Sequence, residues 1–499
     1  MFKRILIANR GEIAVRIARA CRELGIAPLA VYSESDRDSP HVRIAERAAC
    51  IGPAPSRDSY LNMAAVVGAA RALEADAVHP GYGFLAENPA FARAVTAAGL
   101  TFIGPSADAI AAMGDKTRAR SIVSAAGVPV VPAIADPGAD TAGARAAAEP
   151  LGYPLLIKAA AGGGGKGMRI VREAAEFDAA FAAAGREATA AFGDGRLFVE
   201  RYFERPRHIE VQVLADHHGA IVHLGERECS VQRRYQKIVE ESPSPGVSPA
   251  RREQLTAAAT AVARSVGYAN AGTVEFLVSE AGEFHFLEMN TRLQVEHPIT
   301  EWVSGVDLVQ AQIRVAAGEP LWIRQADLEL RGHAIECRLY AEDPAQQFLP
   351  SPGRIARVQE PQGPGVRVDS GICAGCLVPV HYDPLLAKLS VWGADREAAR
   401  RRLIAALREY TVLGVTTNLP FLLDVVSHDA FAAGHTHTHF IEQHLPAWRP
   451  SGTQVELAAL AAALHAALAP AAGVGDGTAP RRPSPWQTLG SWRIGSEGR

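Results

Sequence analysis

Lysine is scarce in this 499-residue sequence, in which most of the 51 cationic residues are arginine. The lysines are Lys3, Lys116, Lys158, Lys166, Lys237 and Lys388. Arginine therefore supplies general surface charge, and a retained lysine indicates a place that needs a compact ammonium, for example beside a phosphate oxygen. We interpret Lys3 and Lys388 as chance retention and the other lysines as candidate phosphate contacts.

The sequence also lacks an excess of charge of either sign and a long apolar run. The net charge of −3 gives no electrostatic reason to expect nucleic acid or an acidic membrane as a partner. The most apolar stretch, Leu457–Ala469, is too short to span a bilayer and is followed by Pro470. Its leucines recur at helical spacing and predict a packed amphipathic helix. No cleavable leader precedes the strand-like Ile5–Ala8, so we expect a soluble cytoplasmic protein, or a mitochondrial matrix form without its transit peptide.

Six cysteines are scattered along the chain, which excludes a disulfide framework of the kind found in small secreted domains. Cys373 and Cys376 form a single CxxC pair, and no second pair completes a zinc site. We therefore expect ordinary reduced thiols.

Short apolar runs alternate with helix-like segments through the first hundred residues. The runs include Ile5–Ala8, Pro28–Tyr32 and Ala75–Val78, and this alternation predicts a parallel sheet covered by helices. Such sheets bind ligands beyond the carboxyl ends of their strands, where Asn9–Glu12 and His79–Asn88 would lie. No G-x-G-x-x-G follows the first strand, so a dinucleotide fold is not indicated.

A run of four glycines, Gly162–Gly165, lies between Lys158 and Lys166. Ala160 and Gly167 stand where a Walker A loop needs glycine and Ser or Thr, so the P-loop interpretation fails. The glycines still let the backbone approach a polyphosphate closely, which favours phosphate binding.

The strongest pattern lies between Thr273 and Pro298. Two strand-like runs, Thr273–Val278 and Glu283–Glu288, are joined by a turn at 279–282, so Glu275 and Glu288 should face each other across a hairpin. A divalent cation removes the repulsion between such carboxylates, and Asn290 lies on the same face. If the chain stays extended to Glu296, the polar residues Glu288, Asn290, Arg292, Gln294 and Glu296 form one row.

The chemistry of this predicted row changes along its length. Its first two members suit Mg²⁺ and phosphate, whereas Arg292 offers a planar fork for a small oxyanion. Glu296 could accept a proton from that anion, and Arg338 is a separate candidate for stabilising negative charge.

Four long motifs resemble the biotin carboxylase component of biotin-dependent carboxylases. They are Ile7–Ala14, His79–Asn88, Met113–Lys116 and Glu288–Pro298, and the resemblance covers roughly residues 1–447. It implies an α/β and α+β chain in which a Rossmann-like domain (1–114) precedes an ATP-grasp domain (115–330). The lid would lie at about 131–203, with a mixed β/α C-terminal domain at 331–447 and a partly flexible tail at 448–499.

The resemblance also implies ATP- and bicarbonate-dependent carboxylation of biotin through carboxyphosphate. In it, Arg292, Glu296, Arg338 and Lys237 would be catalytic, with Glu296 as the base and Arg338 stabilising the biotin enolate. Bicarbonate would contact Lys237, Arg292, Gln294 and Val295, and Tyr82 would border the biotin ring beside Arg338. Mg²⁺ (or Mn²⁺) would bind Glu275, Glu288 and Asn290. ATP would contact Lys116, Lys158, Gly164, Gly165, Glu200, Arg201, Tyr202, Phe203, His208, Glu275 and Glu288.

The end of the chain resembles α-subunits of acyl-CoA carboxylases, especially the methylcrotonyl-CoA type. No Met-Lys-Met biotin acceptor occurs, so biotin should come from a carrier protein or a missing extension. A carboxyltransferase subunit and a second copy in a homodimer are further expected partners. Two alternatives remain open, namely another ATP-grasp ligase that forms an acyl-phosphate and an inactive, truncated scaffold.

Overall fold

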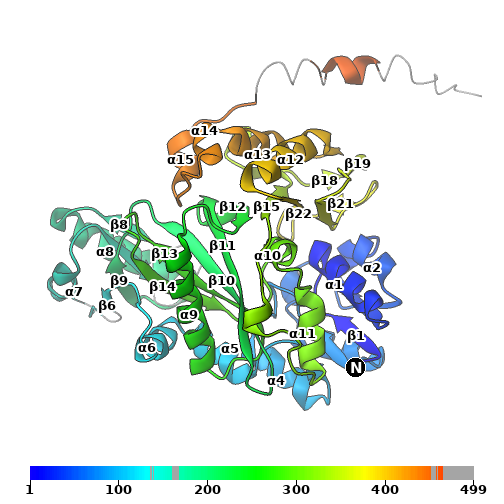
Figure 1. Cartoon of the computed structure of the whole chain (residues 1–499), viewed down its shortest axis with the longest axis horizontal. Coiled ribbons are helices and arrows are strands. Elements are labelled where there is room, and N and C mark those ends of the chain that lie inside the picture. Colours follow the sequence, from blue (N-terminus) through cyan, green and yellow to red (C-terminus); the bar gives the residue numbers. More distant parts are fainter. Residues whose placement is uncertain (135–136, 139, 160–167, 451–456, 458, 465–499) are drawn as a thin grey trace, which may run out of the picture. The chain divides into compact units, whose positions relative to one another are not determined.

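The structure is a computed structural model that describes residues 1–134, 137–138, 140–159, 168–450, 457 and 459–464. The chain separates into a large unit, Met1–Trp448, and a second unit, Arg449–Arg499. All sheets described below belong to the large unit (Figure 1).

The N-terminal region is the predicted parallel sheet, with strand order β3-β2-β1-β4-β5. Strand β1 (Arg4–Ile7) buries Ile5, Leu6 and Ile7 because helices cover both faces of the sheet. Beyond the strand ends, the Asn9 amide donates to the carbonyls of Pro80 and Tyr82 at 2.7 Å each, so the two predicted loops meet. The other elements are α1 (Gly11–Glu23), β2 (Ala27–Tyr32), α2 (Pro40–Ile44), β3 (Arg47–Cys50), α3 (Met63–Ala72), β4 (Ala77–His79), α4 (Pro89–Ala97), β5 (Thr101–Phe102) and α5 (Ala107–Gly114).

An eight-stranded sheet of order β14-β13-β10-β11-β12-β15-β22-β20 forms the centre of the large unit. Its strands are β10 (Arg207–Ala215), β11 (Ile221–Arg233), β12 (Gln236–Ser242), β13 (Asn270–Val278), β14 (Phe284–Asn290), β15 (His333–Tyr340), β20 (Val366–Ser370) and β22 (Leu385–Gly393). The predicted hairpin is confirmed, because Glu275 on β13 is the direct cross-strand partner of Glu288 on β14. The sheet continues through the β12–β15 pairing across residue 330.

Helices and short strands surround this sheet (Figure 1). The helices are α6 (Lys116–Ala125), α9 (Pro249–Ser265), α10 (His297–Ser304), α11 (Leu308–Ala316), α12 (Arg396–Glu409), α13 (Leu419–Ser427), α14 (Asp429–Ala432) and α15 (Phe440–His444). The short strands are β16 (Glu342–Asp343), β17 (Leu349–Pro350), β18 (Gly353–Arg354), β19 (Arg357–Gln359), β21 (Leu377–Val378) and β23 (Thr411–Leu413).

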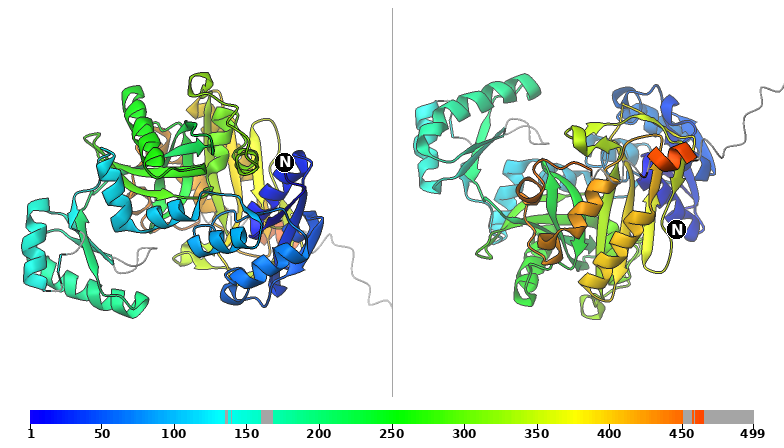
Figure 2. Two further views of the ribbon diagram at one scale, coloured as in Figure 1. Left: turned by 90° about the horizontal axis from the view of Figure 1, so that it is seen from below. Right: turned by 90° about the horizontal axis from the view of Figure 1, so that it is seen from above.

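A four-stranded sheet of order β6-β9-β7-β8 forms the region predicted as a lid. The elements of this region are β6 (Ala133–Ile134), α7 (Thr141–Ala148), β7 (Leu155–Ala159), β8 (Arg169–Val171), α8 (Ala174–Phe192) and β9 (Leu197–Arg201). Phe177 and Phe181 of α8 pack on Leu155, Ile157 and Val199 in a separate hydrophobic core. Figure 2 shows this region, in cyan and teal, standing out from one side of the large unit.

The predicted extended row from Glu288 to Glu296 is wrong in its second half. Strand β14 ends at Asn290, and Glu296 has a turn conformation (φ −81°, ψ 12°). The cause is helix α10, which begins at His297 with Pro298 in its first turn, a position that suits proline's fixed φ. The chain therefore leaves the sheet before the row is complete.

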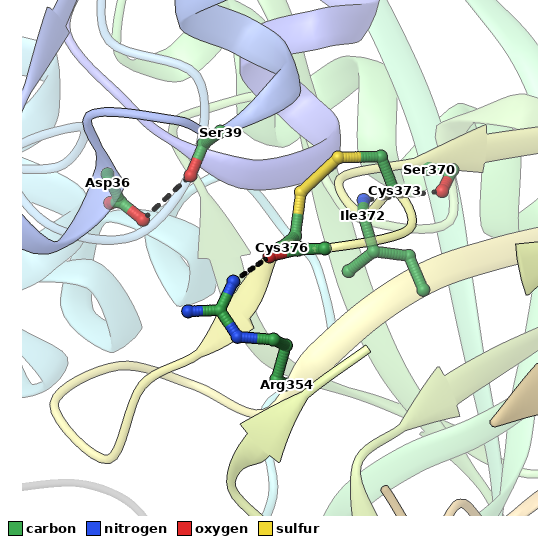
Figure 3. The surroundings of a disulfide bond; sticks show 8 residues. Asp36, Ser39, Arg354, Ser370, Ile372, Cys373 and Cys376 are labelled. Carbon is green, nitrogen blue, oxygen red and sulfur yellow. Dashed lines mark hydrogen bonds between the residues drawn. A yellow bond between two sulfur atoms is a disulfide. The ribbon is translucent and has the colours of Figure 1, made fainter. Parts of the chain in front are cut away.

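The expectation of reduced thiols at the CxxC pair is also wrong. Cys373 and Cys376 form a disulfide in the loop between β20 and β21, and the remaining cysteines are free. Figure 3 shows Arg354 beside this loop, where its guanidinium donates to the Gly375 carbonyl at 2.6 Å. The expectation was wrong because the scatter of cysteines along the chain excludes only a framework of several disulfides, whereas this disulfide closes one local turn.

In the second unit, the described residues at 457 and 459–464 are helical, as predicted. Leu457, Leu460 and Leu464 are exposed, and the packing of this helix stays a prediction. Within the described part of the chain, every helix is too short or too polar to cross a bilayer.

Candidate active site

A cavity of about 1010 Å³ lies where the central sheet meets the lid region and the C-terminal strands. Its walls include every predicted site residue in the described part of the chain except Tyr82. These are Lys116, Lys158, Glu200, Arg201, Tyr202, Phe203, His208, Lys237, Glu275, Glu288, Asn290, Arg292, Gln294, Val295, Glu296 and Arg338. Gly164 and Gly165 lie outside the described residues.

Lys237, on β12, is a cation in this cavity that binds three carboxylates. Its ammonium donates to Glu210 at 2.6 Å and to Glu275 and Glu296 at 2.8 Å each. Burial opposes the charge, but these carboxylates hold the pKa of Lys237 well above its ordinary value. Lys237 is therefore protonated at neutral pH, and its three hydrogen bonds use all the donors of the ammonium.

Glu275 connects this cation to the predicted metal ligands. Its Oε1 also accepts from the Asn290 amide at 2.9 Å and from the Gln294 amide at 2.7 Å, while Oε2 lies 3.0 Å from His208 Nε2. Burial would raise the pKa of Glu275, but Lys237 and His208 hold it well below its ordinary value. Glu275 is therefore a carboxylate at neutral pH.

Glu288 opens into the cavity opposite Glu275. Desolvation of its carboxylate by the surrounding protein, and then repulsion from the Glu275 charge, raise the pKa of Glu288 above its ordinary value. Two facing carboxylates and the Asn290 amide oxygen form a donor set of oxygen atoms only, which is the chemistry that Mg²⁺ and Mn²⁺ prefer. These residues fit a divalent cation that offsets the repulsion between the carboxylates.

Glu296 reaches the site although the extended row is broken. One of its oxygens accepts from Lys237, and the other accepts from Arg338 at 2.9 Å. Burial raises its pKa, but Lys237, Arg338 and Arg227 together hold the pKa well below its ordinary value. Glu296 is an anion and only accepts hydrogen bonds in this state.

Arg338 and Arg292 line the same cavity as this carboxylate. Arg338, on β15, also donates to Glu240 at 2.6 Å, so it belongs to a buried network rather than to an isolated strand ion pair. Arg292 donates to Glu87 at 2.9 Å and to the Asn290 side-chain oxygen at 3.0 Å. Both guanidiniums thus line the cavity with carboxylates beside them.

The opposite end of the cavity lies against the lid region. Lys158 on β7 forms an ion pair with Glu200 on the adjacent β9. Tyr202 and Phe203 follow directly, and the Tyr202 hydroxyl is 2.9 Å from His439 Nε2 of the C-terminal region. His208 lies between the two ends, with Nδ1 3.0 Å from the Gln232 amide.

Several residues of the site were missed by the sequence reasoning. Glu210 lies two residues after the expected ATP contact His208 on β10, so the two side chains share a strand face and this spacing was an available signal. Arg227 is fully buried and donates five hydrogen bonds, to Glu210, Gln212, Thr273, Gln294 and Thr300. Glu87 and Glu240 carried no separate signal, because their partners are more than 90 residues away in the sequence.

Tyr82 lies outside the cavity wall. Its hydroxyl donates to the Glu12 carboxylate at the start of α1, and its carbonyl accepts from Asn9. Lys388 Nζ is 3.3 Å from the other Glu12 oxygen and donates to the Val295 carbonyl at 2.7 Å. Tyr82 is thereby connected to the segment that carries Glu296.

Comparison with known proteins matches successive parts of the chain to three family profiles. Residues 1–110 match "Biotin carboxylase, N-terminal domain", and residues 336–443 match "Biotin carboxylase C-terminal domain". Residues 115–324, which contribute most of the cavity, match "Carbamoyl-phosphate synthase L chain, ATP binding domain".

Individual relatives agree with these profiles. Biotin carboxylase of Allochromatium vinosum is 50% identical over 446 residues, covering 89% of this chain and 99% of that protein. The mitochondrial methylcrotonoyl-CoA carboxylase subunit alpha of Mus musculus is 48% identical over 453 residues, which cover 91% of this chain and 63% of the longer subunit.

A solved structure reproduces the fold. The biotin carboxylase domain dimer of Hydrogenobacter thermophilus 2-oxoglutarate carboxylase, in complex with MgADP, ADP and bicarbonate, has a TM-score of 0.86 and 46% identity over 90% of this chain and 99% of that one. The identity and coverage of these relatives, together with the cavity's paired carboxylates and cations, show that this chain is an ATP-grasp enzyme of the biotin carboxylase family.

Proposed function

We propose that this chain carboxylates biotin on a carrier protein, using ATP and bicarbonate, by way of carboxyphosphate. The observation that carries the proposal is Glu296, held as an anion between Lys237 and Arg338 in the cavity that Lys158 and the 200–203 segment also line. A proton acceptor and two cations beside a nucleotide site suit the activation of a small oxyanion.

ATP is assigned to the end of the cavity next to the lid region. Segment 200–203 would hold the adenine edge largely through its backbone, while Lys116, Lys158 and His208 would contact phosphate oxygens. The ion pair between Lys158 and Glu200 supports this, because it already keeps the ammonium beside the adenine segment. Gly164 and Gly165 belong to the same proposal from the sequence alone.

Glu275, Glu288 and Asn290 would hold Mg²⁺ (or Mn²⁺). The bound cation would neutralise charge on the nucleotide phosphates and thereby favour attack on the terminal one. Desolvation and then the charge of Glu275 raise the pKa of Glu288, and the bound cation would offset the repulsion between these carboxylates.

Bicarbonate is assigned to Lys237, Arg292, Gln294 and Val295. Glu296 would take the bicarbonate proton, and the resulting oxyanion would attack the γ-phosphorus of ATP, releasing ADP and forming carboxyphosphate. A carboxylate with a depressed pKa is a weak base. Lys237 and Arg338 therefore have to turn from Glu296 towards the substrate anions for the proton transfer to proceed.

Carboxyphosphate would then decompose to CO₂ and phosphate. The phosphate takes the N1 proton of biotin, and the biotin enolate attacks CO₂ to give carboxybiotin. Arg338 would stabilise the enolate, and Tyr82 would border the biotin ring. The link from Tyr82 through Glu12 and Lys388 to Val295 supports the placement of these two subsites next to each other.

The two alternatives make different demands on the site. Another ATP-grasp ligase would use the nucleotide end but has no need of Arg292, Glu296 and Arg338 together. An inactive scaffold would have no reason to keep buried cations and carboxylates paired at 2.6–2.9 Å. We favour neither.

The expected partners are a biotin carboxyl carrier protein or domain, a carboxyltransferase subunit and a second copy of this chain. The final carboxyl acceptor, expected to be an acyl-CoA, lies outside the proposal because this reaction does not contact it. We place the reaction in the cytoplasm.

The test is carboxylation of free biotin by the purified chain with ATP, Mg²⁺ and labelled bicarbonate. Acid-labile label on biotin and ADP release that depends on both biotin and bicarbonate are expected. ATP cleavage that ignores bicarbonate would favour the other ligase, and no cleavage with or without a biotinylated carrier would favour the scaffold.

A further inference from the structure

Lys388 is a fully buried lysine at the middle of a charged row across the central sheet. It lies on β22 between Arg338 on β15 and Asp369 on β20, its direct cross-strand partners, and only 1% of it is exposed. Burying a charge is costly unless partners compensate it. The interpretation of Lys388 as chance retention is therefore wrong.

The Lys388 ammonium connects three segments that are distant in sequence. It donates to the Val295 carbonyl at 2.7 Å and lies 3.3 Å from Glu12 and 3.9 Å from Asp369. Val295 precedes Glu296, and Glu12 accepts the Tyr82 hydroxyl hydrogen bond. One ammonium thus joins the segment of the proposed base to the support of the proposed biotin contact.

The remaining charges around Lys388 are already engaged or uncharged. Arg367, on β20, donates to Asp369 at 2.7 Å and to Glu301 at 2.7 Å. Glu336, on β15, is fully buried, and burial raises its pKa well above the ordinary value. His297, at the start of α10, has its pKa held well below the ordinary value by burial. Among the described residues, Lys388 is therefore the cation that forms an ion pair with the Glu12 carboxylate.

A lysine suits this place better than an arginine. Its donors diverge from one nitrogen and can reach a carbonyl and two carboxylates in different directions, whereas a guanidinium presents a planar fork. The Lys388 nitrogen also lies 6.0 Å from the centre of the Tyr82 ring.

We propose that Lys388 is a positioning residue that fixes the hydrogen-bonded pair of Tyr82 and Glu12 (the Tyr82–Glu12 arm) relative to the Val295–Glu296 segment. Biotin and bicarbonate are thereby held at a fixed distance from each other. This inference rests on the proposed function, because it assigns Tyr82 to biotin and Glu296 to bicarbonate. Lys388 itself does not touch the reacting atoms in this account. Its effect is on the distance between two substrates, and an error of about 1 Å in such a distance costs on the order of 100-fold in rate.

The experiment compares Lys388→Met and Lys388→Arg with the unchanged chain. We measure the Kd for ATP, the KM values for bicarbonate and free biotin, and kcat. Lys388→Met should lower kcat/KM for biotin by about 100-fold and leave the Kd for ATP within about twofold. Lys388→Arg should recover only part of the loss, since it restores charge without the geometry. A purely structural role would instead weaken ATP binding and turnover together.

Glu12→Gln decides the matter if Lys388→Met does not fold. It keeps the bond from Lys388 to Val295 but weakens the Tyr82 arm, so it should raise the KM for biotin at least about tenfold with the KM for bicarbonate unchanged. Equal changes in both KM values, or none, would overturn the proposal. If the unchanged chain shows no biotin-dependent turnover, the proposed function fails instead, which separates the two failures.

Discussion

Replacing Lys237 by methionine should destabilise the protein strongly, and the loss should shrink as the pH falls. The substitution keeps an apolar stem but removes the cation from between Glu210, Glu275 and Glu296, whose oxygens lie 2.6–2.8 Å from the ammonium. Removing one partner from a buried charge cluster costs about 3–5 kcal/mol. We expect that loss of unfolding free energy at pH 8.

The sign of the pH dependence follows from the pKa shifts. In the unchanged chain the pKa values of Glu275 and Glu296 are depressed, so their contribution is present above the ordinary glutamate pKa and is lost as the pH falls through the depressed values. Without Lys237, burial acts with less opposition and raises these pKa values. The variant then folds with protons bound, which favours it at low pH.

Urea unfolding midpoints measured from pH 8 to pH 5 test this prediction. Lys237→Arg is the matched control, because it retains the charge and should lose less than half as much stability. A deficit in Lys237→Met that stays constant, or grows, towards pH 5 would show that Lys237 does not hold these carboxylates ionised.

Three further predictions concern other parts of the molecule. The denatured, unreduced protein should expose four thiols to a thiol reagent and six after reduction, and six thiols without reductant would contradict the disulfide. Replacing both Cys373 and Cys376 by serine should lower the unfolding free energy by about 2 kcal/mol, which is the chain entropy that closing so short a loop removes from the unfolded state. Burial, with Lys388 opposing, raises the pKa of Glu12 to about 7. As the pH rises from 4.5 through 7, the unchanged chain should therefore lose up to about 3 kcal/mol of unfolding free energy relative to Glu12→Gln. A gain of unfolding free energy over this pH range would refute the assignment. Glu288→Gln should raise the Mg²⁺ concentration for half-maximal ATP cleavage at least about tenfold, whereas Glu283→Gln, at the turn before the same strand, should not change it.

Local patterns predicted the parts of the fold that neighbouring residues determine. The alternation around Glu275 and Glu288, with a glycine turn between them, was sufficient to place the two carboxylates opposite each other. The continuous apolar run at Ile5–Ile7 likewise predicted a strand buried on both faces.

The same rule failed where a different element began. Period-two alternation continued to Glu296 in the sequence, but α10 had to start at His297, so the chain turned after Asn290. Pro298 was the signal that the extrapolation ignored, since proline favours the first turn of a helix.

The network that holds the site together could not be predicted from spacing. Lys388 and Glu12 are 376 positions apart, and their contact depends on how β22 meets the start of α1. The family resemblance named Arg338 and Glu296 as functional residues, but it carried no information about Glu240, which accepts from Arg338, or about Lys388, which donates to the backbone carbonyl next to Glu296.

The central claim, that bicarbonate attacks the γ-phosphate of ATP in this cavity, is tested most directly by the fate of a bicarbonate oxygen. Turnover with ¹⁸O-labelled bicarbonate in unlabelled water, analysed by mass spectrometry, should place one labelled oxygen in each phosphate released, and Glu296→Gln should abolish this transfer while ATP still binds. Phosphate without the label would mean that water attacks ATP, and full transfer in Glu296→Gln would show that another group takes the proton.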